Sequence, residues 1–146
     1  MVLLAPPTLK NADPASYQQR YNKPLMPILE RARQLVKQGK GNTVLTNTDM
    51  IICPKANVTA ASFVSYYGQD LRLDTPYLLP KIRKPTLVIV AGGDEVVPGL
   101  YKVVGPLADG KILHMQVLPD ADHFFRDLHA EDAADAISVF LKTHAF

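Results

Sequence analysis

The stretch Thr86-Leu-Val-Ile-Val-Ala-Gly-Gly-Asp94 decides the fold of this chain. Its first five residues are mostly apolar and rich in β-branched side chains, a pattern typical of a parallel strand that is buried on both faces. The two glycines indicate a turn directly after the strand. We therefore predict a buried strand over 86–90 with Asp94 just beyond its carboxyl end.

The chain after Asp94 reads as helix, strand, loop and helix. We expect a helix over 98–107, a partly exposed edge strand over 112–118 and a last helix over 130–143. The last helix should turn five apolar side chains inward, namely Ala133, Ala136, Ile137, Phe140 and Leu141. Strands that alternate with helices predict an α/β fold with a parallel sheet.

The first half of the chain is less regular. Val2 to Ala5 form a short apolar run that predicts a strand buried on both faces, and an amphipathic helix is expected from about Pro24 to Gln38. Shorter helices should begin at Asp13-Pro14, at Asn57 to Thr59 and at Asp74. The pattern over 42–58 leaves short strands and irregular connections both open.

Composition narrows the class of protein. The 146 residues carry a net charge of +2 and are 47% hydrophobic, which excludes intrinsic disorder and does not indicate binding of nucleic acid. No apolar run approaches the roughly 20 residues that span a bilayer, and the start of the chain is a poor signal peptide. The single cysteine, Cys53, is compatible with a reducing cytoplasm, so we expect a cytoplasmic protein without membrane contact.

Asp94 and His123 are the one pair of residues whose positions in the sequence indicate a catalytic role. Each follows the carboxyl end of a predicted strand, and two such loops are neighbours at one rim of a parallel sheet. A carboxylate that accepts a hydrogen bond from imidazole fixes the tautomer and stabilises the imidazolium after the ring takes a proton. We therefore expect Asp94 and His123 to be the catalytic acid and histidine of a triad.

The segment Pro85 to Pro98, followed by Leu118-Pro-Asp-Ala-Asp-His-Phe-Phe125, resembles the C-terminal part of an α/β-hydrolase. The resemblance implies a partial α/β-hydrolase core over 1–7 and 85–146, with about three parallel strands and flanking helices. The resemblance also implies that residues 8–84 form a helical cap insertion. Two positions depart from the family, which usually has glycine where Ala91 and Asp120 stand.

The nucleophile of that family is absent from the sequence. Its serine lies in a G-x-S-x-G motif ahead of the acid, and none of the four serines here has glycine two residues before and two after it. The resemblance therefore implies the back half of an esterase-like serine hydrolase, inactive as this chain alone. An ester-type small molecule would be the substrate if an N-terminal half completed the site.

Other residues have less specific interpretations. Phe124, Tyr66 and Tyr67 are candidate substrate-binding residues, although the tyrosines fit a core stripe equally well. Cys53 is far better interpreted as a small buried apolar residue than as a nucleophile. The sequence around it does not have the strand-to-helix turn that exposes a catalytic nucleophile. The spacing of histidines indicates no metal site, and no cofactor is expected.

Two further functions stay open beside the enzymatic one. A truncated hydrolase could serve as a non-catalytic interaction or binding module, and a small flavodoxin-like ligand binder is a third possibility. In the truncated case the strand over 2–5 would expose an apolar edge, so we expect a homodimer that covers this edge by strand pairing.

Overall fold

The computed structural model describes residues 1–144, which divide into two compact units. The first unit consists of Met1–Thr8 and the chain from Asp74 onward, and the second unit is Leu9–Leu73. Residues 74–84, which the sequence assigned to the insertion, therefore belong with the first unit. Their attachment is visible in the backbone, where Thr75 N–H donates to the carbonyl of Pro7 at 3.3 Å.

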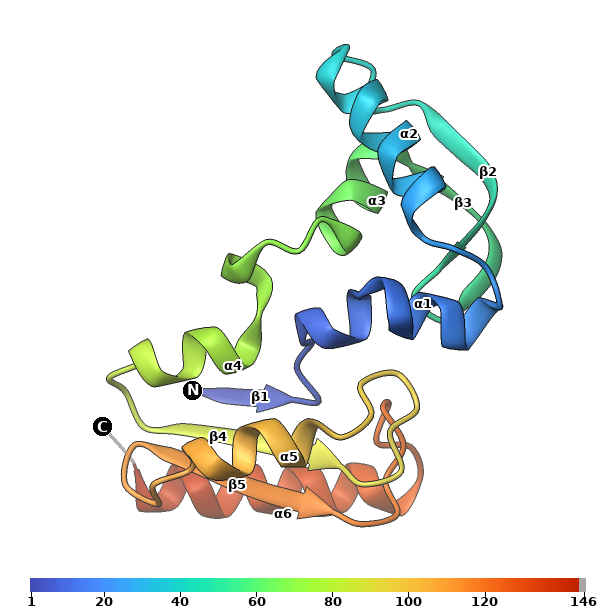
Figure 1. Cartoon of the computed structure of the whole chain (residues 1–146). Coiled ribbons are helices and arrows are strands. Elements are labelled where there is room, and N and C mark those ends of the chain that lie inside the picture. Colours follow the sequence, from blue (N-terminus) through green and yellow to red (C-terminus); the bar gives the residue numbers. More distant parts are fainter. Residues whose placement is uncertain (145–146) are drawn as a thin grey trace. The chain divides into compact units, whose positions relative to one another are not determined.

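The first unit is built on a parallel sheet of three strands (Figure 1). The strands are β1 (Val2–Leu4), β4 (Thr86–Ala91) and β5 (Leu113–Leu118), in the order β1-β4-β5. All six residues of β4 are buried, as expected for the central strand. This sheet and its helices confirm the predicted α/β class and the predicted edge position of β5.

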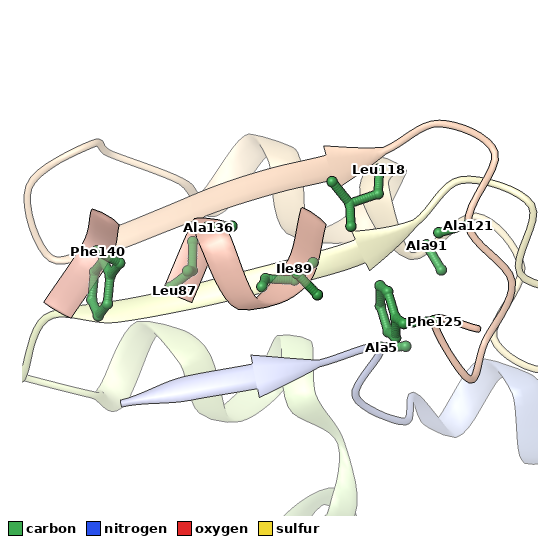
Figure 2. Packing of buried hydrophobic residues seen from close by; sticks show 10 residues of the cluster. Ala5, Leu87, Ile89, Ala91, Leu118, Ala121, Phe125, Ala136 and Phe140 are labelled. Carbon is green, nitrogen blue, oxygen red and sulfur yellow. The ribbon is translucent and has the colours of Figure 1, made fainter. Parts of the chain in front are cut away.

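Helices lie on both faces of this sheet. Helix α6 (Leu128–Thr143) packs on the face that carries Leu87 and Ile89, and Figure 2 shows Phe140 and Ala136 against these strand residues. The opposite face is covered by α5 (Leu100–Val104), which continues as a 3₁₀ turn over Gly105–Leu107. The remaining helices of the unit are short, α4 (Thr75–Leu78) and a 3₁₀ turn over Leu79–Lys81.

Two burial predictions for this unit are wrong. Leu141 was expected to face inward with Phe140, yet its exposed fraction is 50%, whereas that of Phe140 is 6%. Neighbours on a helix lie about 100° apart, and the contact face of α6 is too narrow to include both. Strand β1 is an edge strand and not a fully buried one, because Leu4 is 45% exposed.

The second unit combines helices with a β-hairpin. Its elements are a 3₁₀ turn (Leu9–Ala12), α1 (Pro14–Tyr21), α2 (Met26–Lys37), β2 (Val44–Met50), β3 (Cys53–Thr59), α3 (Ala60–Tyr67) and a 3₁₀ turn (Leu71–Leu73). Strands β2 and β3 pair antiparallel, which settles the open reading of 42–58 in favour of strands. The segment expected as a helical cap insertion thus contains a hairpin as well as helices.

Side-chain caps set the helix starts that the sequence indicated. Asp13 accepts from Ser16 N–H before α1, Asp74 accepts from Tyr77 N–H before α4, and Thr59 accepts from Ser62 N–H before α3. The last start lies at Thr59 because Asn57 and Val58 still belong to β3. None of the helices within residues 1–144 has the length and apolar character needed to span a membrane.

A buried carboxylate stabilises the hairpin of the second unit. Asp49 lies in β2, and its Oδ1 accepts from Lys55 N–H at 2.9 Å while Oδ2 pairs with Nζ of Lys23 at 2.6 Å. The hydrogen bond from Lys23, reinforced by that from Lys55, holds the pKa of Asp49 below its ordinary value. Asp49 therefore ties the two strands of the hairpin to the segment between α1 and α2.

Candidate functional site

Asp94 is held rigidly at the carboxyl end of β4. Its side chain is buried, and its Oδ1 accepts hydrogen bonds from the backbone N–H groups of Val96 at 2.7 Å and Val97 at 2.8 Å. A buried carboxylate needs such donors, because leaving it without partners costs several kcal/mol. With Oδ1 occupied in this way, Oδ2 is left to face a different partner.

That partner is His123, which follows β5. Its Nδ1 lies 2.9 Å from Oδ2 of Asp94, and the imidazole is 26% exposed. A carboxylate only accepts, so Nδ1 carries the proton and donates it to Asp94. In the neutral ring the lone pair then lies on Nε2, and no residue within 1–144 makes a hydrogen bond to that atom. The structure thus brings together the two residues singled out from the sequence.

The two loops are joined by backbone hydrogen bonds just beyond the strand ends. Gly92 N–H donates to the carbonyl of Leu118 at 2.8 Å, and Gly93 N–H donates to the carbonyl of Ala121 at 3.0 Å. These bonds extend the β4–β5 pairing past its last register pair, Ala91 with Leu118. The acid loop and the histidine loop are therefore fixed to each other before their side chains meet.

Gly92 is a positioning residue that the sequence reasoning missed. A Cβ atom at this position would overlap the carbonyl oxygen of Pro119 and would lie 2.7 Å from its carbonyl carbon. Only glycine allows the two loops to approach so closely. In the sequence, the Gly92-Gly93 pair was interpreted as a turn after the strand, and a turn alone does not reveal the close approach to Pro119.

The histidine loop is anchored by Phe125, the second residue after His123. Phe125 is buried in the core of the first unit beside Ala5 and Ala121, as Figure 2 shows. Its φ is 48°, a left-handed conformation that costs a non-glycine residue about 1–2 kcal/mol. Burial of this ring fixes the loop in spite of that cost. Asp122 does not compete for His123, because it accepts from Phe124 N–H and pairs with Arg126.

The three candidate substrate-binding residues have different surroundings. Phe124 is 59% exposed, and its ring stands edge-on to His123 with centroids 5.2 Å apart. Tyr67 is buried in the core of the second unit, where its hydroxyl accepts from Ile51 N–H and burial raises its pKa. Tyr66 packs against Tyr67 at the border of the same core. The tyrosines therefore fit the core-stripe interpretation, and Phe124 lies beside His123 within the first unit.

Among the described residues, the remaining cysteine and histidine side chains do not form a second candidate catalytic or metal-binding site. Cys53 is exposed on β3, so the expectation of a buried cysteine is wrong, and it belongs to the second unit, whereas Asp94 and His123 belong to the first. In the described part of the chain, no three side chains of the His, Cys, Asp or Glu type are grouped as metal ligands. His129 pairs with Asp132 at 3.4 Å on the exposed surface of α6.

The arrangement supplies an oriented base at the rim of a parallel sheet. Asp94 fixes the orientation of the His123 ring through Nδ1, and the imidazole is partly exposed to solvent. No protein-family model matches the chain, and a comparison with curated proteins finds no match either. We therefore infer the function from the geometry of the Asp94–His123 pair.

Proposed function

We propose that this chain supplies the acid and the histidine of a Ser-Asp-His triad in an esterase-like serine hydrolase of the α/β-hydrolase type. The observation that carries the proposal is the 2.9 Å contact between Nδ1 of His123 and Oδ2 of the buried Asp94. Both residues follow adjacent parallel strands, and the acid precedes the histidine in the chain. That order matches the order of acid and histidine in this class of enzyme.

In this mechanism the two residues activate a serine that another segment provides. Nε2 of His123 would take the serine proton as the hydroxyl attacks the ester carbonyl, and it would return the proton to the leaving alcohol. Asp94 would stabilise the imidazolium through the bond to Nδ1. The 146 residues contain no G-x-S-x-G motif, so serine-dependent turnover requires a second polypeptide segment.

The proposal is tested by supplying this chain with the segment that would carry the serine. The coding sequence directly upstream of Met1 is read for an in-frame G-x-S-x-G motif, and the encoded segment is produced together with this chain. We expect a fluorophosphonate probe to label a serine in the combined protein and not in this chain alone. Hydrolysis of a p-nitrophenyl ester by the combined protein should fall by about 10³-fold or more in His123→Gln and in Asp94→Asn.

A matched control is available on α6. His129 also contacts a carboxylate and is 32% exposed, close to the 26% of His123. His129→Gln should leave the activity of the combined protein unchanged. A combined protein without activity, or one whose activity survives His123→Gln, would contradict the proposal.

The second candidate function is a homodimeric binding module without catalysis. Strand β1 lies at the edge of the sheet. Its last residue, Leu4, is 45% exposed, and Met1, which precedes the strand, is 44% exposed. An apolar edge strand of this kind favours pairing with another strand. We infer that two copies pair their β1 strands antiparallel across a two-fold axis.

Light scattering coupled to size exclusion measures the mass in solution. A dimer should have twice the chain mass of 16.1 kDa, and the Leu4→Lys variant should have the mass of a monomer. Val36→Lys on α2 is the matched control, because Val36 is similarly exposed but lies in the second unit. A monomeric wild-type protein at high concentration would exclude this candidate.

A further inference from the structure

We propose that the Asp94–His123 pair by itself cleaves activated aryl esters, with Nε2 of His123 as the nucleophile. This inference rests on the same two residues as the proposed triad, but it needs no serine. It assigns to the chain alone an activity that differs from serine-dependent hydrolysis in its nucleophile and in its range of substrates.

The first support is the fixed orientation of the ring. Asp94 is held by two backbone N–H groups through Oδ1 and binds Nδ1 of His123 through Oδ2. The neutral ring is thereby held in the tautomer whose lone pair lies on Nε2. The imidazole is 26% exposed, and within residues 1–144 its hydrogen bond is made through Nδ1, so we take Nε2 as the ring nitrogen that meets the substrate.

The second support is an apolar surface beside the nucleophile. The ring of Phe124 stands at 86° to the imidazole, with centroids 5.2 Å apart, and it is largely exposed. The backbone of Phe124 is held in place because its N–H donates to Oδ1 of Asp122 at 3.0 Å. An aryl group can pack against this ring while its ester carbonyl approaches Nε2. The favoured substrate class is therefore the aryl ester.

The chemical step follows from these positions. Nε2 forms a bond to the carbonyl carbon, the bond from that carbon to the aryl oxygen breaks, and the aryloxide leaves with the electron pair. The acyl group then resides on Nε2, and Nδ1–H stays bonded to Asp94, which stabilises the positive ring. Water attacks the acyl carbon, the carbon–nitrogen bond breaks, and its electron pair returns to Nε2. One proton of the attacking water passes through solvent to the released aryloxide. The products are the carboxylic acid and the phenol.

The leaving group limits the range of substrates. An aryloxide is a good leaving group, whereas an alkoxide is a poor one that needs a proton from a general acid as it departs. Since His123 is itself the acylated group in this step, it has no proton on Nε2 to donate. We therefore expect p-nitrophenyl acetate to be cleaved and ethyl acetate to be untouched.

The first experiment measures release of p-nitrophenolate by the purified full chain. His123→Gln should lower the rate above the buffer background by about tenfold, whereas His129→Gln should change it less than about twofold. Near-UV circular dichroism confirms that each variant is folded. Equal losses in the two variants, or an unchanged rate in His123→Gln, would overturn the proposal.

The second experiment locates the acyl group. The reaction is quenched in acid during turnover, and peptide mass spectrometry should find an acetyl group on His123. Acetyl groups on lysines alone would overturn the proposal, as would an Asp94→Asn variant that retains the full rate. These failures would leave the triad proposal standing, because serine labelling in the combined protein does not depend on turnover by this chain alone.

Discussion

Nδ1 of His123 lies 2.9 Å from Oδ2 of Asp94, although 29 positions separate the two residues in the sequence. Three features produce this contact: parallel pairing of β4 with β5, the backbone bonds of Gly92 and Gly93, and the buried anchor Phe125. The contact is therefore a property of the framework of the first unit, and changes to that framework should alter it.

Substitutions at Asp94 should separate its structural role from its orienting role. Asp94→Ala removes the common acceptor of the Val96 and Val97 N–H groups and should lower the free energy of unfolding by about 2–4 kcal/mol. Asp94→Asn keeps an acceptor for these groups but offers an NH₂ group to His123, so the ring should adopt the Nε2–H tautomer with a smaller loss of stability. Urea denaturation and ¹⁵N shifts of the imidazole check both expectations. A His123 ring that keeps Nδ1–H in Asp94→Asn would contradict them.

Gly92→Ala should disturb the dyad through the backbone. The added methyl group would overlap the carbonyl of Pro119, so the two loops must move apart at a cost of about 1–3 kcal/mol. We expect the downfield Nδ1–H proton resonance of His123 to be lost or shifted. Gly105→Ala is the control in the same unit, because its nearest neighbour is the flexible end of Met115 at 3.5 Å. If Gly92→Ala leaves the resonance unchanged, Gly92 is not a positioning residue.

Truncation of the adjacent residues Phe140 and Leu141 should change the free energy of unfolding to very different extents. Phe140→Ala removes a buried ring from the core of the first unit and should lower the free energy of unfolding by about 3–5 kcal/mol. Leu141→Ala alters a half-exposed side chain and should change that free energy by less than about 0.5 kcal/mol. Thermal or urea denaturation measures both. Comparable losses in the two variants would mean that α6 is rotated from the orientation described.

Asp49 should make the stability of the second unit depend on pH. The hydrogen bond from Lys23 lowers its folded-state pKa below the ordinary value of 3.8, so the ionised group adds stability above that pH. This contribution is lost as the pH falls through the folded-state pKa. Asp49→Asn should therefore lower the free energy of unfolding at pH 7 by about 1–2 kcal/mol, and its difference from wild type should shrink below pH 3.8.

A second aspartate in the same unit serves as the control for that experiment. Asp70 pairs with Arg72, whose hydrogen bond lowers the pKa of Asp70 to about 2, but this pair is exposed to solvent. Asp70→Asn should thus cost less stability than Asp49→Asn, because water screens exposed pairs. Tyrosine circular dichroism follows the second unit, where Tyr17, Tyr21 and Tyr67 lie in contact. The reverse ranking of the two variants would contradict the assignment.

The sequence was sufficient to predict those elements in which the local residue pattern and the tertiary packing favour the same structure. The β-branched run of β4, the edge character of β5 and the caps at Asp13 and Asp74 were all confirmed by the structure. The proximity of Asp94 and His123 followed from one topological rule, that consecutive parallel strands end at the same rim.

The remaining features depend on contacts that no local pattern encodes. Strand β2 contains Asn47, a residue type that is depleted in strands and here has a left-handed φ of 51°, and its pairing with β3 has register shifts. Leu141 is apolar like Phe140, and only the width of the sheet decides which of them is covered. The close approach at Gly92 becomes apparent only when the neighbouring carbonyl of Pro119 is located.

The pairing of Val2 with Leu87 has a consequence for the order in which the chain folds. During synthesis β1 emerges before β4, and this hydrogen-bonding partner follows only after the whole of Leu9–Leu73 has been made. The entropic cost of closing a loop rises with its length, so an early fold of the intervening residues shortens the effective loop and favours late capture of β1. We therefore expect the hairpin-containing unit to mature on the ribosome before the parallel sheet is complete.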